Sequence, residues 1–173
     1  VSMHGVTFGE AIVNHDWPWW RKQFTLFFRT YFIKGENRNM NLVFISPNFP
    51  TYYWNFCKSL RERGVTVLGV GDAPYDDLVN ETKESLVEYY RVNNLQNYDE
   101  VYRAMGFFIG KYGRIDYIES QNEFWLELEA QLREDFNIHH GLRPKKLEVM
   151  KFKSKMKDVY KKANVPTARY KVI

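Results

Sequence analysis

Polar side chains that could bind a substrate follow the apolar segment 115–118, which is β-prone and of strand length. They are Glu119, Ser120, Asn122 and Glu123, and an amphipathic helix is predicted directly after them. In an open α/β sheet, ligands bind at the carboxyl ends of strands, beside the N-termini of the following helices. These groups are therefore the first candidates for contact with a polar substrate.

Two of these residues also have a structural interpretation, and the sequence leaves both open. Ser120 and Glu123 form the pattern S-x-x-E, which is typical of a capping box at the start of a helix. The predicted helix has one apolar stripe and one solvent-facing side. The stripe comprises Phe124, Trp125, Leu128, Leu132 and Phe136, and the solvent side comprises Glu127, Glu129, Gln131, Arg133 and Glu134.

Two further segments carry candidate residues. Ser46 and Asn48 lie in the S-P-N-F-P loop 46–50, directly after an apolar strand, although this pattern is also that of a plain turn. Lys153 stands at the start of a basic helix predicted over about 154–164, where free backbone N–H groups favour a phosphate. The alternative for Lys153 is a solvated lysine.

The elements that must position these residues alternate between strand and helix. Strands are predicted near 42–46, 66–70, 88–92 and 116–119, with Thr51 capping a helix to about Arg63 and a second helix running from Asn97 or Tyr98 to Gly113. This alternation predicts an α/β fold: a Rossmann-like open, mostly parallel sheet with helices on both faces. No G-x-G-x-x-G follows the first strand, so a nicotinamide cofactor is not expected.

Composition limits the class of protein. The 173 residues suffice for one core of ordinary size, and no apolar run is long enough to span a bilayer. The single cysteine, Cys57, excludes an internal disulfide and favours a reducing, cytoplasmic location; its place in a predicted helix indicates packing. The four histidines do not have metal-ligand spacing, so no metal site is expected within this chain.

Charge and aromatic content divide the chain into three regions. Residues 40–142 carry 9 Lys and Arg against 16 Asp and Glu, whereas residues 143–173 carry 11 against 2, which suggests a polyanionic partner. Residues 1–39 form an N-terminal extension of uncertain origin, aromatic and basic over 17–34, and Met40 is interpreted as the natural start. A membrane-surface helix and an ordinary packed extension are the alternatives for 1–39.

Two motifs give the chain a resemblance to a known family. Residues 40–173 resemble the N-terminal part of ATP-grasp ligases of the carboxylate–amine ligase-like group, through IDYIESQNEFWLELEAQLREDFNIHHG and KFKSKMKDVYKKANVPTARY. Lys153 matches the lysine that begins a helix in that family, and the segment 163–166 matches an A-G-V-P-like turn with Asn164 in place of glycine. The resemblance implies a pre-ATP-grasp domain over 40–142 and the truncated beginning of an ATP-grasp domain over 143–173.

The resemblance also implies a reaction. ATP would activate a small carboxylate as an acylphosphate, and an amine would then displace the phosphate. Lys153 would be one of two lysines that meet the ATP phosphates, and the loop holding Ser46 and Asn48 would approach the acceptor substrate. The second lysine and the Mg²⁺ ligands would follow residue 173, so the chain alone is expected to be catalytically incomplete.

A competing hypothesis is a stand-alone Rossmann-like binding module whose basic C-terminal tail binds nucleic acid. It lacks support from any recognition-helix motif, and the aromatic residues do not alternate with the lysines as a stacking surface requires. The ligase hypothesis involves neither nucleic acid nor membrane, and it leaves open a homodimer.

Deletion of residues 1–39 should leave the melting temperature of 40–173 nearly unchanged, because the regular strand pattern begins only at Met40. Thermal unfolding of both chains, followed by circular dichroism, checks this. A loss of several kcal/mol would show that the extension contributes to the core.

Overall fold

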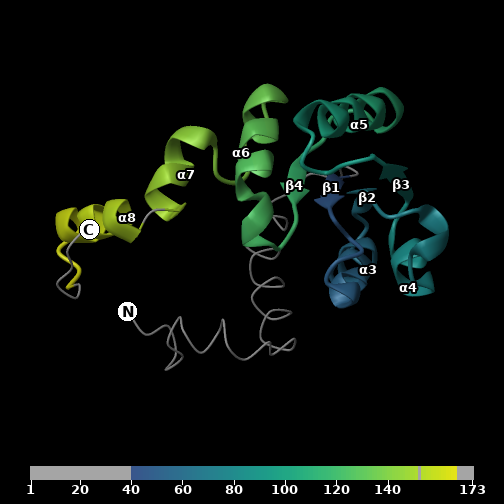
Figure 1. Ribbon diagram of the computed structural model, residues 1–173, viewed down its shortest axis with the longest axis horizontal. Helices are drawn as coiled ribbons and strands as arrows, with labels where there is room; N and C mark the ends of the chain where they lie inside the picture. Colours follow the sequence, from purple (N-terminus) through teal and green to yellow (C-terminus); the bar gives the residue numbers. More distant parts are fainter. Residues whose placement is uncertain (1–39, 152, 167–173) are drawn as a thin grey trace. The chain divides into compact units, whose positions relative to one another are not determined.

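A computed structural model describes residues 40–151 and 153–166 (Figure 1). Within them lies one sheet of four strands, which pair in parallel in the order β3-β2-β1-β4. The predicted fold class is confirmed, and each predicted strand overlaps an observed one. The strands are β1 (Asn41–Ile45), β2 (Thr66–Gly71), β3 (Glu88–Arg91) and β4 (Tyr117–Glu119).

Helices connect consecutive strands, as right-handed crossovers between parallel strands require. In the first connection a 3-10 turn, η1, precedes α3, and in the second η2 precedes α4; α5 makes the third. After β4, the turn η3 leads into α6, and α7 and α8 follow. The bounds are η1 (Thr51–Tyr53), α3 (Trp54–Arg61), η2 (Tyr75–Asp77), α4 (Asn80–Ser85), α5 (Tyr98–Tyr112), η3 (Glu123–Trp125), α6 (Leu126–Asp135), α7 (Pro144–Lys151) and α8 (Lys153–Lys162).

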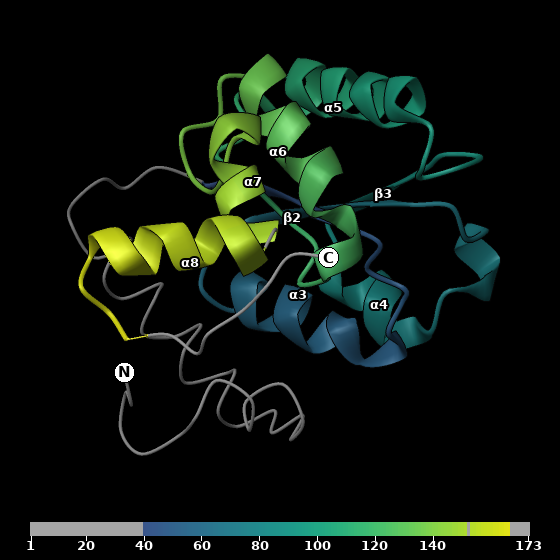
Figure 2. The ribbon, with the colours of Figure 1, turned by 60° about the vertical axis from the view of Figure 1, so that its left-hand side comes forward.

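The sheet is covered on both faces, with α3 and α4 on one side and α5 and α6 on the other (Figure 2). Side chains of β1 alternate between the two layers: Val43 and Ile45 join the core formed with α5 and α6, whereas the ring of Phe44 meets that of Tyr53 before α3. Every residue of β1 is buried, which explains why its sequence is a continuous apolar run after Asn41.

Three sequence-level expectations about helix ends are confirmed. Gly113 ends α5 with a φ of 82°, and Pro144 begins α7. Asn164 takes the left-handed conformation after α8 with a φ of 55°, and the N–H of Val165 donates to the carbonyl of Tyr160 at 2.8 Å. Asn164 therefore replaces the glycine usual at this position, because asparagine tolerates positive φ.

Two expectations about the first crossovers are wrong. Thr51 does not cap the first helix, because Pro50 occupies the N-cap position and no side chain bonds the first turn. The polar segment 73–84, with Pro74 at its start, predicts a turn region without a helix, but α4 begins within it at Asn80. This helix buries only the small polar residues Thr82 and Ser85, so it has no apolar periodicity from which it could be predicted.

Two sequence-level expectations concern residues outside the described ones. They are those for residues 1–39 and a strand that the sequence predicts to begin over 168–173. Among the described residues, no helix is long and apolar enough to cross a membrane.

Gly69→Ala should lower the free energy of unfolding by roughly 1–3 kcal/mol, because overpacking a filled core forces side chains to move. A Cβ at Gly69 would lie 2.7 Å from Leu86 Cδ1 and 3.2 Å from both Pro47 and Tyr89. The matched control is Gly106→Ala in α5, where nothing lies within 4 Å. The control should raise stability by about 0.5–1 kcal/mol through helix propensity. Urea unfolding of both variants measures the contrast, and equal effects would contradict the described packing of β2.

Candidate functional site

The strand order places a topological switch point between β1 and β4. From β1 the chain proceeds outward to β2 and β3, and α5 then returns it to the opposite side of β1. Loops that leave β1 and β4 therefore diverge to opposite faces of the sheet, and ligands of open α/β proteins bind where this happens. The candidate residues from the 46–50 loop and from 119–123 all follow these two strands.

Both loops begin with the same backbone conformation. Phe44 pairs with Glu119, and two residues beyond them Ser46 and Gln121 each have a φ of 56°. Residues other than glycine rarely adopt this conformation, and such residues are frequent at functional sites. The N–H of Ser46 donates to the carbonyl of Val70 at 2.8 Å, so the loop is tied to β2 as it turns.

Asn48 contributes a buried hydrogen-bond acceptor in the loop after β1, on the side of that loop that faces β2. Its Oδ1 has no hydrogen-bond partner among the described residues, and it lies 3.0 Å from the position that a Cβ on Gly71 would occupy. Buried side-chain oxygens nearly always accept a hydrogen bond, so one without a partner is a candidate to bind a ligand or a water molecule. Ser46 is buried, whereas Asn48 as a whole is half-buried. Asn48 is therefore the more accessible of the two residues.

The turn after β4 is organised around two side chains. Glu119 Oε1 accepts from the N–H of Ser120 at 3.2 Å and from that of Gln121 at 3.1 Å. Ser120 is fully buried, and its hydroxyl accepts from the N–H of Asn122 and donates to the Asn122 carbonyl, both at 3.1 Å. Glu119 is half-buried at the carboxyl end of β4 and Glu123 is exposed, so these two residues carry the acidic groups that a substrate could reach.

The predicted capping box is wrong. Asn122 is the N-cap residue, and its Oδ1 accepts from the N–H of Phe124 at 3.0 Å. Because Gln121 adopts positive φ, Ser120 turns inward and bonds within the turn, whereas Glu123 is exposed as the first residue of η3. Ser120 therefore shapes the turn, and Glu123 is left without a capping role.

Tyr53 joins the two loops. Its hydroxyl donates to the carbonyl of Gln121 at 2.6 Å, and its ring packs edge-on against Phe44 and Tyr52. The Tyr53 pKa is raised to about 12, chiefly by burial and also by Tyr52 and the charge of Glu119. The hydroxyl thus remains protonated at neutral pH and holds the positive-φ turn in place.

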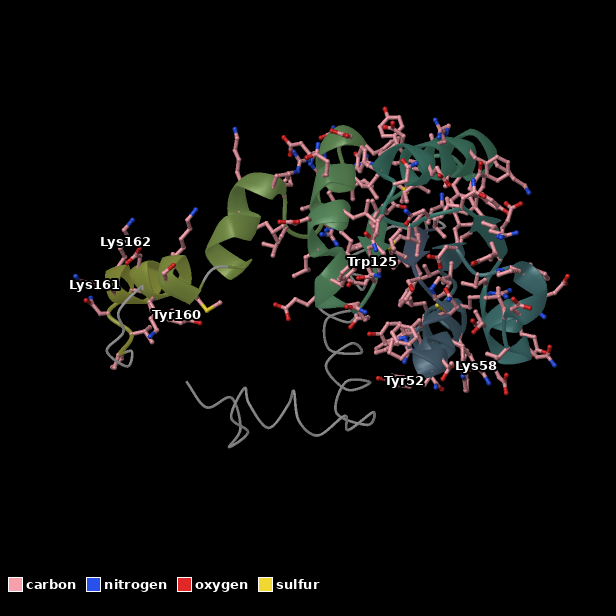
Figure 3. The ribbon with its side chains drawn as sticks, in the orientation of Figure 1. Tyr52, Lys58, Trp125, Tyr160, Lys161 and Lys162 are labelled. Carbon is pink, nitrogen blue, oxygen red and sulfur yellow. The ribbon has the colours of Figure 1, made fainter. Side chains whose placement is uncertain are left out.

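Exposed aromatic side chains stand on the same loops. Phe49 is 66% exposed in the β1 loop and Phe124 is 66% exposed in η3. Figure 3 labels Tyr52 and Trp125, which belong to the turns that follow β1 and β4. The expectation that Phe124 belongs to the buried stripe is wrong, because η3 interrupts the periodicity of the α-helix before Leu126.

Sequence reasoning missed a buried ion pair beside this turn. Glu129 and Arg133 were predicted to face solvent, yet they are 1% and 4% exposed, and Arg133 Nη2 lies 2.7 Å from Glu129 Oε2. The same Nη2 donates to the carbonyl of Ile118 at 2.6 Å. The i, i+4 spacing of a Glu and an Arg was the only signal, and it is typical of exposed pairs too.

The Glu129 carboxylate is electrostatically linked to the turn. Its pKa is raised to about 7, chiefly by burial and also by the Glu119 charge, while Arg133 and Ser120 limit the rise. Its Oε1 has no hydrogen-bond partner among the described residues. The carboxyl end of β4 thus combines two acidic groups, one at the edge and one buried behind it.

Two solved structures share this fold. One is an L-amino acid ligase from Bacillus licheniformis, at 16% identity and a TM-score of 0.54, covering 78% of this chain and 36% of that one. The other is the biotin carboxylase domain of a thermophilic 2-oxoglutarate carboxylase bound to bicarbonate, at 20% identity and a TM-score of 0.56. The latter match covers 75% of this chain and 29% of that one.

The shared fold agrees with the Rossmann-like α/β fold that the sequence predicts for this chain. At these identities the likeness establishes the fold alone. The chain spans about a third of the length of each neighbour. No protein-family profile matches the chain, and no curated protein matches its sequence.

The basic helices are the last part of the candidate site. Lys153 is the first residue of α8, as the phosphate hypothesis requires, but its side chain falls outside the described atoms. Lys161 and Lys162 occupy the last turn of α8 and are exposed (Figure 3). In the part of the chain that the structure describes, no three His, Cys, Asp or Glu side chains are placed to hold a metal ion.

Glu129→Gln should gain stability relative to the wild type as pH rises. In the folded chain the Glu129 pKa is raised from 4.5 to about 7, so the folded state binds the proton more tightly than the unfolded state. The stability of the wild type therefore falls as pH rises from 4.5 to about 7. The glutamine variant does not ionise, so its stability lacks this pH dependence. Between pH 5 and pH 8 the difference in unfolding free energy should shift by about 2 kcal/mol in favour of the variant.

Urea unfolding at several pH values measures this shift. Glu134→Gln on the same helix is the control, since Glu134 is exposed and its contact with Arg143 is a surface pair. A shift in favour of the wild type would mean that Arg133 outweighs burial at Glu129.

Proposed function

We propose that this chain is the N-terminal part of an ATP-dependent carboxylate–amine ligase of the ATP-grasp type. The observation that carries the proposal is the pair of loops at the β1–β4 switch point, which bring Asn48 and Glu119 to one edge of a Rossmann-like sheet. The fold shared with an L-amino acid ligase supports it. ATP would supply the phosphoryl group that activates the carboxylate substrate.

Each residue at the edge has a role in this proposal. Glu119 would orient the amine substrate, because a carboxylate attracts the ammonium form that an amine adopts before it reacts. Asn48 would complete its own hydrogen bonding with a polar group of the substrate. Ser46, Ser120 and Asn122 hold the two turns in shape, and Glu123 adds negative charge at the rim.

The basic helices would serve the nucleotide. Lys153, the first residue of α8, would donate a charge-assisted hydrogen bond to an ATP phosphate. The described residues hold no cluster suited to Mg²⁺, so no role in metal binding is assigned to them.

A nucleic-acid module is the competing function, supported by the excess of Lys and Arg in residues 143–173 and by the exposed Lys161 and Lys162. The two functions differ in how lysines contribute. A hydrogen bond to a phosphate in a built site depends on one position, whereas attraction of a polyanion is nearly additive in charge.

In the full-length ligase, Lys153→Ala should raise the Michaelis constant for ATP or abolish turnover. Lys157→Ala and Lys161→Ala should have small effects, since both lie beyond the first turn of α8. Steady-state kinetics on the three variants tests this, together with a salt titration of binding to a generic oligonucleotide. Equal losses at the three lysines with a steep salt dependence would favour the nucleic-acid module instead.

A further inference from the structure

The buried guanidinium of Arg133 contacts three separate segments. It donates to the carbonyl of Ile118 in β4 at 2.6 Å, to Glu129 on its own helix at 2.7 Å and, through Nη1, to the carbonyl of Leu142 at 3.3 Å. Residues 136–143 join α6 to α7, and Leu142 belongs to the second part of this connection, 139–143, which is called the linker below. One side chain therefore connects the strand that ends at Glu119 with the linker that leads to α8.

The linker passes directly over this guanidinium. Gly141 has a φ of 96°, and a Cβ placed there would lie 2.6 Å from Arg133 Nε and 2.7 Å from its Cζ. A glycine is thus required at this position for two reasons: the positive φ of the backbone and the close approach of Arg133. The linker also stacks on β4, since the rings of His140 and Tyr117 lie 4.3 Å apart at 15°.

β4 is an edge strand of the described sheet, so carbonyl groups on its outer side need partners from outside the sheet. Arg133 supplies one at Ile118, directly before Glu119. The planar guanidinium group of arginine can donate to several acceptors in fixed directions, which the ammonium group of a lysine cannot do. Glu129 in turn supplies a carboxyl oxygen as an acceptor 2.7 Å from the buried guanidinium.

We propose that Arg133 is a positioning residue that fixes the linker 139–143 to the carboxyl end of β4 and so sets the direction in which the chain enters α7 and α8. For catalysis this rests on the proposed function, because only there does the segment with Lys153 meet a substrate held at Glu119. The mechanical part of the proposal, that Arg133 fixes the linker to β4, does not depend on the proposed function. When the linker is fixed, the edge of β4 and the start of α7 move as one unit.

Amide hydrogen exchange on the 1–173 chain tests the mechanical part. Arg133→Lys keeps the charge beside Glu129 but loses the planar guanidinium group, so peptides over 139–147 should exchange at least about tenfold faster. Peptides from β1 and α5 should keep their wild-type rates, because they lie in the core away from the linker. Arg143→Lys is the matched control: Arg143 bonds Asn137 at 3.1 Å and Ile138 at 3.4 Å from the more exposed side of the linker, and its effect should be small.

Gly141 gives a second test through a double-mutant cycle. Gly141→Ala should destabilise the chain more than Gly64→Ala, where φ is 81° and nothing lies within 4 Å. Combining Gly141→Ala with Arg133→Ala should recover part of that excess, because the Nε and Cζ atoms are then gone from the clashing position. Additive effects of the two substitutions would mean that Arg133 does not constrain the linker.

Two outcomes overturn the proposal: unchanged exchange at 139–147 in Arg133→Lys, or equal acceleration of linker and core peptides. Should Arg133→Lys fail to fold, the pair Arg133→Met with Glu129→Gln removes both buried charges and is measured instead. Failure of the proposed function has a different signature. Linker exchange would follow the predictions, while Lys153→Ala would leave ATP kinetics unchanged.

Discussion

The structure depends on the parallel pairing of β1 with strands on both of its sides. Asn41–Ile45 pairs with β2 along its whole length and with β4 over Leu42–Phe44, so β1 is buried on both faces and at both edges. Because the chain must leave β1 in one direction and return on the other side, α3 and α5 are forced onto opposite faces. The same reversal places the loops after β1 and β4 at the carboxyl ends of neighbouring strands, and the polar candidates lie in these two loops.

Polar groups at this edge are organised by backbone strain and by burial together. Ser46 and Gln121 adopt positive φ at equivalent positions beyond β1 and β4, and the hydroxyl of Tyr53 bonds across to the second turn. Glu119 is left at the surface of this arrangement, while Glu129 lies behind it with a raised pKa because burial disfavours its charge. A site built on these turns is rigid in its backbone but keeps an accessible carboxylate.

Buried charge also explains how the sheet and the C-terminal helices are joined. A lone guanidinium in the core would be costly, but Arg133 is compensated by Glu129 and by two carbonyl groups from different segments. Such a pair adds little net stability compared with apolar packing, and we infer that it serves to specify one arrangement. Gly141 makes the same arrangement possible, because any side chain there would occupy the space of Arg133.

The sequence by itself determined the fold class, the four strands and several helix ends, because apolar periodicity and the φ preferences of Gly113, Pro144 and Asn164 act locally. It also placed Ser46, Asn48, Glu119 and Asn122 after the right strands. Only the tertiary structure decided that β4 returns beside β1, and hence that these residues share an edge. It likewise decided that Asn122, not Ser120, caps the helix and that Glu129 and Arg133 are buried. These outcomes depend on contacts distant in sequence, for which a local pattern carries no signal.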